Sequence, residues 1–149
     1  MVKSPLVVVT GGAGFYGGVL IRRLLSSGYR VRVLDALHYG PEPIMELFIN
    51  PNFEFIQGDV LDRELVAKTV SDADVVVHLA ALVGYPLCKK HPDLARRVNV
   101  DGTRNVLDTI RPQTRLIYAS TGSNYGEVAG ICTEDTPLNP LSIYGETKT

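Results

Sequence analysis

Two side chains near the end of the sequence, Tyr144 and Lys148, could carry out proton-transfer chemistry. They are four residues apart, so in a helix they lie on the same face. A free tyrosine has a pKa near ~10 and is a poor base at neutral pH, but a nearby ammonium stabilises the phenolate and lowers that pKa. Such pairs occur by chance in many helices. This pair gains meaning because it follows a predicted strand and the hydroxyl groups of Ser120 and Thr121.

A glycine-rich segment, TGGAGFYG, follows the first apolar run of the chain. Gly11 permits a tight turn, Gly14 lets a pyrophosphate approach the backbone, and Gly17 lets the following helix pack close to the sheet. The N–H groups of the first helical turn, including those of Phe15 and Tyr16, then face the anion. The segment predicts a dinucleotide site, with a ligand-free glycine turn as the alternative.

The acidic residue expected in such a site is Asp35, at the end of the second predicted strand. Its carboxylate can accept hydrogen bonds from both ribose hydroxyls of an adenosine and would repel a 2′-phosphate, which favours NAD over NADP. One alternative is a solvated carboxylate that ends a strand. Another is an NADP site in which Arg30 or Arg32 binds the phosphate. We favour NAD because neither arginine follows Asp35, where the phosphate would lie.

These residues need a scaffold, and short apolar runs alternate along the chain with helical spacings. Strands are predicted over residues 6–9, 30–34, 53–56, 75–79 and 116–118. Helices are predicted from residue 19 to a stop at Gly28, over residues 61–70 and over residues 94–110, and residues 40–52 are expected to form a loop with one short helical turn. Strands that alternate with helices imply a parallel α/β sheet with right-handed crossovers.

The composition excludes several classes of protein. The 149 residues suffice for one domain, and 15 basic against 16 acidic side chains give no basic stripe for nucleic acid or for an anionic membrane. No stretch approaches transmembrane length and the first apolar run is too short for a signal peptide, so we expect a cytoplasmic protein. Cys88 and Cys132 lie far apart without metal-ligand spacing, so we expect free thiols and no metal site.

Taken in order, the motifs resemble those of the extended short-chain dehydrogenase/reductases, which include nucleotide-sugar epimerases of the UDP-glucose 4-epimerase type and dehydratases. The glycine segment resembles the family's TGGxGFxG loop, residues 58–60 resemble its GD(I/V/L) element, and residues 78–81 resemble its H-x-A-A strand end. The resemblance implies that Asp59 and Val60 contact the adenine, although residues 58–59 could also form a plain turn. It also implies that a cofactor is lined by the backbone of Leu79, Ala80 and Ala81.

Two further residues in this region are interpreted from their surroundings. His78, taken alone, is better explained as a hydrogen-bonded core histidine than as a catalyst. Asn99 falls between Val98 and Val100 in the long predicted helix, where a polar side chain is disfavoured unless it finds partners. In the family, the matching asparagine ties the helix to the active-site strand and borders the cofactor.

The same resemblance assigns catalytic roles. Residues 120–126, STGSNYG, are similar to the family pattern S-(S/T)-x-x-x-Y-G. This implies that Thr121 hydrogen-bonds the sugar hydroxyl, with Ser123 a secondary contact, while Tyr144 takes the proton as hydride passes to NAD. Lys148 would bind the nicotinamide ribose. Asn124 departs from the usual valine and leaves the substrate open.

The expected reaction is epimerisation of a nucleotide sugar by transient oxidation to a keto-sugar. Dehydration is disfavoured because Gly122 and Ser123 stand where the family's 4,6-dehydratases carry Asp and Glu. The alternatives are an NAD-dependent sugar dehydrogenase or reductase, or a dehydratase, or a non-catalytic NAD-binding sensor. A sensor need not keep Thr121, Tyr144 and Lys148 together, which argues against it.

Family members are longer than this chain. The resemblance therefore implies that residues 1–149 are the NAD-binding domain of a longer enzyme, with a Rossmann-type doubly wound parallel sheet that is incomplete at its C-terminal edge. The lobe that binds the nucleotide of the substrate would lie outside these residues, so we expect them to be inactive alone. Residues 82–88 are expected to form a loop over the nicotinamide, and the full-length enzyme is expected to be a homodimer.

Overall fold

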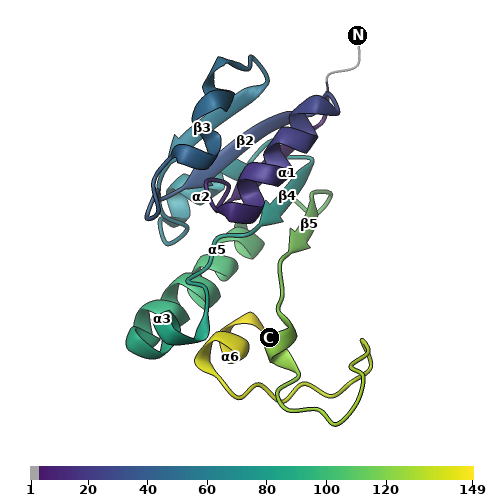
Figure 1. Cartoon of the computed structure of the whole chain (residues 1–149). Helices are drawn as coiled ribbons and strands as arrows, with labels where there is room; N and C mark the ends of the chain where they lie inside the picture. The colour runs from purple at the N-terminus through teal and green to yellow at the C-terminus, as the bar shows by residue number, and fades with distance from the viewer. Residues whose placement is uncertain (1–3) are drawn as a thin grey trace.

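The computed structural model describes residues 4–149, and its strands form one parallel sheet (Figure 1). The strand order is β3-β2-β1-β4-β5. The five strands, each within one residue of the predicted bounds, are β1 (Leu6–Thr10), β2 (Arg30–Asp35), β3 (Phe53–Gln57), β4 (Val75–His78) and β5 (Arg115–Tyr118).

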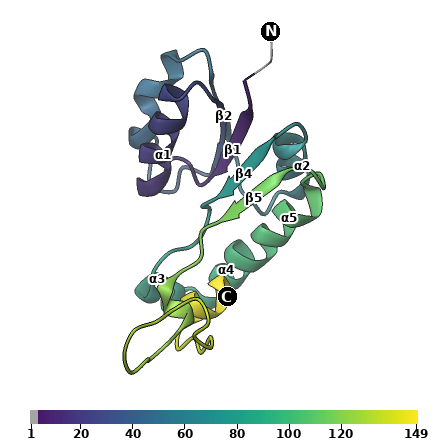
Figure 2. The same cartoon turned by 90° about the vertical axis from the view of Figure 1, so that its right-hand side faces the viewer.

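Alternate side chains of each strand point to opposite faces of the sheet. Both faces are apolar here, and helices cover both. On one face, Val7 and Val9 of β1 pack with Ile21 of α1 (Phe15–Ser26) and with the 3₁₀ helix η1 (Glu42–Ile49). On the other face, Val8 packs with α2 (Arg63–Val70) and α5 (Gly102–Thr109). Figure 2 shows α1 on one side of the sheet and α2 and α5 on the other.

Two segments are more helical than the sequence predicted. Residues 40–52 contain the eight-residue η1 instead of one short turn, because Ile44 and Leu47 are buried three residues apart, which is the repeat of a 3₁₀ helix. The expected loop over residues 82–88 is partly replaced by α3 (Tyr85–Lys90). Its first turn contains Pro86, whose fixed φ suits a helix start. The side chain of Cys88 is the one that α3 buries.

The long predicted helix is present but not uniform. It begins at Pro92, earlier than predicted, as α4 (Pro92–Arg96), continues as the π-helical η2 (Arg97–Asp101) and ends as α5. Asn99 lies in the middle of the π turn. The remaining elements are the short 3₁₀ helix η3 (Gly122–Asn124) and α6 (Ile143–Lys148). Among the described residues, no helix is both long and apolar enough to cross a lipid bilayer.

The strand order defines a Rossmann-type doubly wound sheet, since the direction of winding reverses between β1 and β4. Ligands of such sheets bind beyond the carboxyl ends of the strands at this reversal. Here those ends carry Thr10, Asp35, His78 and Tyr118, and α3 and α6 lie beyond them, below the sheet in Figure 1. Within residues 4–149, β5 is an edge strand of the sheet, and Ile117 is half-exposed.

Candidate functional site

The turn that leaves β1 depends on Gly11. Its backbone has a φ of +71°, a left-handed conformation that side chains other than glycine rarely adopt. A Cβ at this position would also lie 2.6 Å from the backbone nitrogen of Ala80, after β4. The Gly11 N–H donates a 2.8 Å hydrogen bond to the carbonyl of Leu34 in β2. The predicted tight turn is therefore present, and it is packed between two strand ends.

Close packing of the glycine loop involves two further glycines. A Cβ on Gly17 would overlap the backbone of Gly12, and a Cβ on Gly12 would lie 2.7 Å from the side chain of Val33. Gly17 thus lets α1 pack against the loop, not directly against the sheet as predicted, and Gly12 lets the loop pack on the sheet. Gly12 was missed from the sequence, although it is the second glycine of the TGG motif.

The N-terminus of α1 is arranged as an anion site. Gly14 is its N-cap residue and contributes no side-chain hydrogen bond. The side chains of Phe15 and Tyr16 are 83% and 79% exposed, and their backbone N–H groups donate no hydrogen bond within residues 4–149. Free N–H groups at the start of a helix attract anions. This placement agrees with the role predicted for the loop.

Asp35 is bonded to the glycine loop. Its Oδ2 accepts a 2.9 Å hydrogen bond from the N–H of Ala13, and its Oδ1 accepts one of 2.8 Å from the N–H of Leu37. Leu37 has a φ of +57°, the one positive value among the described residues other than glycine. A carboxylate has about four lone-pair positions, so acceptor capacity remains for a diol.

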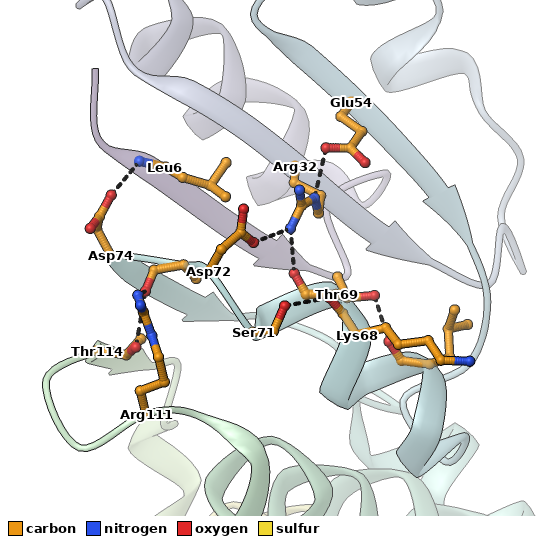
Figure 3. A network of polar contacts seen from close by, with 12 residues as sticks. Leu6, Arg32, Glu54, Lys68, Thr69, Ser71, Asp72, Asp74, Arg111 and Thr114 are labelled. Carbon is orange, nitrogen blue, oxygen red and sulfur yellow. Dashed lines mark hydrogen bonds and ion pairs between the residues drawn. The ribbon is translucent and has the colours of Figure 1, made fainter. Parts of the chain in front are cut away.

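The structure argues against the alternative of an arginine-bound 2′-phosphate. Arg32 is held on the face of the sheet that α2 covers, where its guanidinium bonds Glu54 at 2.7 Å and Asp72 at 2.6 Å (Figure 3). Arg30 begins β2 while Asp35 ends it, and five residues of strand span roughly 16 Å. Neither arginine is placed to bind a phosphate beside Asp35.

The residues predicted to bind adenine lie in the turn after β3. Asp59 Oδ1 accepts a 2.9 Å hydrogen bond from the N–H of Leu61, so the carboxylate does stabilise a turn. Val60 is buried, with its side chain against Gly102 of α5, and its carbonyl accepts a 2.9 Å hydrogen bond from Asn105 Nδ2. The Val60 side chain is therefore a core contact, and only the backbone of Val60 and the Asp59 carboxylate remain candidates for the predicted adenine contact.

The segment after β4, which includes Leu79, Ala80 and Ala81, is held from two sides. The backbone of Thr10 accepts from the N–H of Leu79 at 3.0 Å, and Thr10 Oγ1 accepts from the N–H of Ala80 at 3.3 Å. At its far end, Asn99 Oδ1 accepts from the N–H of Leu82 at 2.7 Å. The backbone expected to line a cofactor is thus fixed by a strand end and by the π turn.

Asn99 has the partners that its apolar surroundings require. It is buried, and its Nδ2 donates to the carbonyl of Leu82 at 3.1 Å and to Oγ1 of Thr147 in α6 at 2.9 Å. The amide therefore joins the long helix to the segment after β4 and to the helix that carries Tyr144 and Lys148. π turns are frequent at functional sites.

His78 is a satisfied core histidine, as predicted. Its Nδ1 lies 2.6 Å from Thr10 Oγ1 and its Nε2 lies 3.0 Å from Thr103 Oγ1. Thr103 Oγ1 donates its proton to the carbonyl of Asn99, so it must accept from Nε2. Burial, with a smaller effect from Lys148, lowers the pKa of His78 to about 4, so the imidazole is neutral with its proton on Nε2.

Helix α6 presents Tyr144 and Lys148 one turn apart, as the sequence predicted. Ser142 is its N-cap, and Ser142 Oγ accepts a 3.0 Å hydrogen bond from the N–H of Gly145. Lys148 is only 3% exposed, and its Nζ lies 4.0 Å from the centroid of the Tyr118 ring. Burial lowers the pKa of Lys148 to about 8.

Thr121 and Tyr144 are brought together, as predicted. The pKa of Tyr144 lies above its ordinary value, because burial raises it most, a hydrogen-bonding interaction with Thr121 lowers it, and the nearby Cys88 raises it. Lys148 is not among the groups that shift this pKa, so the predicted lowering by its ammonium is not found here. The reason is geometric: the ammonium lies over Tyr118 instead.

The residues around Thr121 form a compact polar turn. Thr121 Oγ1 accepts a 3.2 Å hydrogen bond from the N–H of Ser123, and Asn124 Nδ2 donates to Ser120 Oγ at 2.7 Å. Asn124, which stands in place of the family's valine, is buried, and its hydrogen bond to Ser120 braces this turn. Cys88 and Cys132 are free thiols, as expected, and Cys88 is buried with its Sγ 3.2 Å from the carbonyl of Leu82.

The sequence reading missed four residues that hold this site together. They are the side chains that contact Lys148, His78 and Asn99, namely Thr10, Thr103, Tyr118 and Thr147. Tyr118 had a signal in the sequence, since it is an aromatic residue at the end of the strand that leads into the turn of Thr121. The three threonines had none beyond their positions in the motifs.

Comparisons with known proteins agree with this geometry. A sequence profile of the NAD dependent epimerase/dehydratase family matches residues 7–149. The UDP-glucose 4-epimerase of Lactobacillus helveticus is 38% identical over 147 residues, which are 95% of this chain and 43% of that protein. The chain therefore belongs to the NAD dependent epimerase/dehydratase family.

Solved structures give the same result. DesIV, the dTDP-glucose 4,6-dehydratase of Streptomyces venezuelae with NAD and TYD bound, superposes with a TM-score of 0.89 at 31% identity, over 96% of this chain and 48% of that one. The UDP-glucuronic acid 4-epimerase of Bacillus cereus in complex with NAD gives a TM-score of 0.86 at 35% identity, over 96% and 48%. The chain spans about half the length of these relatives.

Proposed function

We propose that this chain is the NAD-binding domain of an enzyme that epimerises a nucleotide sugar through a transient keto-sugar. Membership of the family supports a nucleotide-sugar epimerase or dehydratase. The observation that carries the choice of reaction is the turn at residues 120–126, which supplies the hydroxyl of Thr121 and contains no carboxylate.

The described residues fit the cofactor. The uncapped N-terminus of α1 offers N–H groups to a pyrophosphate, and the Asp35 carboxylate keeps acceptor capacity beside the loop. The phosphate groups would contact the turn of Gly11, Gly14, Phe15, Tyr16 and Gly17. The adenosine would contact Asp35, Asp59 and Val60, and the nicotinamide end would lie along Leu79, Ala80, Ala81, Asn99, Tyr144 and Lys148.

NAD would supply the acceptor of the hydride and its later donor. The residues of this chain would bind the substrate hydroxyl and move its proton. Thr121 Oγ1 would hydrogen-bond that hydroxyl and orient it toward Tyr144, whose ionised form, the phenolate, would take the proton and later give it back. Lys148 would bind the nicotinamide ribose, and the positive charge of the bound nicotinamide would favour the phenolate.

The same turn disfavours dehydration. Elimination of water needs an acid and a base near the substrate, and the family's 4,6-dehydratases place Asp and Glu directly after the threonine. Here those positions are Gly122 and Ser123, and a Cβ on Gly122 would have no neighbour within 4 Å. The site thus has a proton-transfer pair for oxidation and return of hydride, and no carboxylate in this turn to drive elimination.

The test uses the full-length protein, meaning the complete product of its reading frame. It is incubated with UDP-glucose, UDP-N-acetylglucosamine, UDP-glucuronic acid and dTDP-glucose, and the sugars are followed by proton NMR. Epimerisation appears as a new sugar of the same mass, whose proton coupling constants show that the configuration at one ring carbon is inverted. A 4-keto-6-deoxy product would show dehydration instead, and net reduction of added NAD would show a dehydrogenase.

A further inference from the structure

Lys148 is a buried cation without an acidic partner. The residue is 3% exposed, and none of the ion pairs formed within residues 4–149 includes it. An ammonium that is taken out of water without compensation is costly. The ring of Tyr118 takes the place of an acidic partner, because its centroid lies 4.0 Å from Lys148 Nζ. This is well within the range of a cation–π interaction.

The Tyr118 ring is itself held in place. It stacks on the His78 imidazole, with ring centroids 6.0 Å apart and planes inclined by 25°. His78 is in turn bonded by Thr10 at the end of β1 and by Thr103 in α5. A chain of contacts therefore runs from Thr10 at the end of β1 through His78 and Tyr118 to Lys148.

An aromatic ring differs from a carboxylate in what it leaves free. A carboxylate would pair with the ammonium and occupy its N–H donors, whereas a ring face attracts the charge through its quadrupole and takes up no conventional hydrogen bond. We propose that Tyr118 is a positioning residue, which holds the Lys148 ammonium over its ring so that the N–H donors directed away from the ring stay available at the carboxyl ends of β4 and β5. This proposal rests on the proposed function, in which Lys148 binds the nicotinamide ribose.

The first experiment tests the position of Lys148 without an activity assay. Full-length protein labelled with ¹³C-lysine is studied by NMR, and the Lys148 signal is identified as the one lost in Lys148→Arg. Because the side chain lies over a ring, its Hε signal should be shifted upfield. The shift should vanish in Tyr118→Leu and persist in Tyr118→Phe, which keeps the ring. Tyr118→Met gives a second variant without a ring that fills the same space.

The second experiment measures the consequence for the cofactor. Calorimetry with NAD should show affinity about tenfold weaker in Tyr118→Leu and Tyr118→Met, and nearly unchanged in Tyr118→Phe. Tyr29→Leu is the matched control, because it removes a partly buried tyrosine ring at the opposite end of the sheet. This control should leave the Lys148 signal and NAD affinity as they are.

Two results would overturn the proposal: a Lys148 signal that is unchanged in Tyr118→Leu and Tyr118→Met, or unchanged NAD affinity in both. A failure of the proposed function looks different, because it would appear as a dehydration product or as net reduction of NAD in the product assay of the unmutated protein, whatever the NMR signal does. The two ideas are therefore tested separately.

Discussion

The amide of Asn99 donates a 2.9 Å hydrogen bond to Oγ1 of Thr147, although 48 residues separate them in the sequence. The same side chain binds both the N–H and the carbonyl of Leu82. One buried amide in the π turn therefore connects the backbone after β4 with the helix of Tyr144 and Lys148. The two halves of the candidate site are positioned relative to each other by this residue.

Loss of that amide should destabilise the protein strongly. In Asn99→Ala, the part-buried N–H of Leu82 loses its partner while the Leu82 carbonyl keeps only the Cys88 thiol, and an unsatisfied group costs about 1–3 kcal/mol. Thr147→Val removes only the hydroxyl that accepts from Asn99 and should cost about 1 kcal/mol. Urea unfolding of both variants and of the double variant measures the coupling between them. An Asn99→Ala protein as stable as the unmutated one would contradict the bracing role.

Asp35 should determine the choice between NAD and NADP. Asp35→Ala removes an acceptor that is charged and bonded to the loop, so NAD affinity should fall by about 10–100-fold while discrimination against NADP is relaxed. Calorimetry with both cofactors on the full-length protein provides the measurement. Asp72→Asn is a matched control, since that carboxylate binds Arg32 on the covered face of the sheet. Equal affinity of the unmutated protein for both cofactors would remove the basis of this assignment.

The parts of the site that lie close together in the sequence were predicted well. Gly11 directly follows β1 and Asp35 ends β2, and their predicted roles follow from a backbone turn and from a charge at these points. Tyr144 and Lys148 share a helix face because four residues make about one turn. In these cases the local pattern determines the local geometry.

The parts that depend on contacts between distant segments were not predicted. Tyr118 reads as an apolar strand residue, and nothing in its own segment indicates that Lys148, thirty positions later, will lie over its ring. The π turn around Asn99 has nearly the apolar spacing of an ordinary helix, so the pattern alone did not reveal it. The length of η1 is determined by the burial of Ile44 and Leu47 against α1 and the sheet, which is a tertiary effect.

The pKa of Lys148 should make stability depend on pH in the alkaline range. Burial lowers this pKa from an ordinary value of 10.5 to about 8. Between those values the unfolded chain binds more protons than the folded chain, so the free energy of unfolding rises with pH. Below pH 8 both states are protonated and the full cost of the buried ammonium is present.

Urea unfolding at several pH values measures the free energy of unfolding of the unmutated protein and of Lys148→Met. As the pH rises from 8, this free energy should increase for the unmutated protein relative to Lys148→Met. Lys89→Met, which alters an exposed lysine of α3, is the control and should give no such trend. A difference between protein and Lys148→Met that does not change with pH would show that the ammonium is not penalised by burial.

Tyr144 should be indispensable for turnover but not for binding NAD. Tyr144→Phe keeps the ring and removes the proton acceptor, so turnover by the full-length protein should fall by about 10²–10⁴-fold with NAD still bound. Tyr85→Phe, in α3, is the control for loss of a tyrosine hydroxyl nearby. Lys148→Ala should reduce both turnover and NAD affinity. Substantial activity in Tyr144→Phe would mean that another group acts as the base.

The glycine loop allows a matched comparison of two residues with positive φ. Gly11 and Gly28 have φ values of +71° and +84°, so alanine is strained at both positions, by about 1–2 kcal/mol. Only Gly11 is crowded: its new Cβ would lie 2.6 Å from the Ala80 nitrogen, whereas a Cβ on Gly28 has no neighbour within 4 Å. Both substitutions thus introduce backbone strain, whereas only alanine at position 11 clashes with the segment after β4.

Gly28→Ala should therefore lower the free energy of unfolding by about 1–2 kcal/mol and leave NAD affinity unchanged, because the turn after α1 lies at the amino ends of the strands. Gly11→Ala should cost more stability. It must displace either Ala80 or the loop, so it should also reduce NAD binding below detection by calorimetry. Urea unfolding and calorimetry on both variants separate the two effects. If Gly11→Ala binds NAD as well as Gly28→Ala does, the close approach of the loop to the end of β4 is not needed for the cofactor.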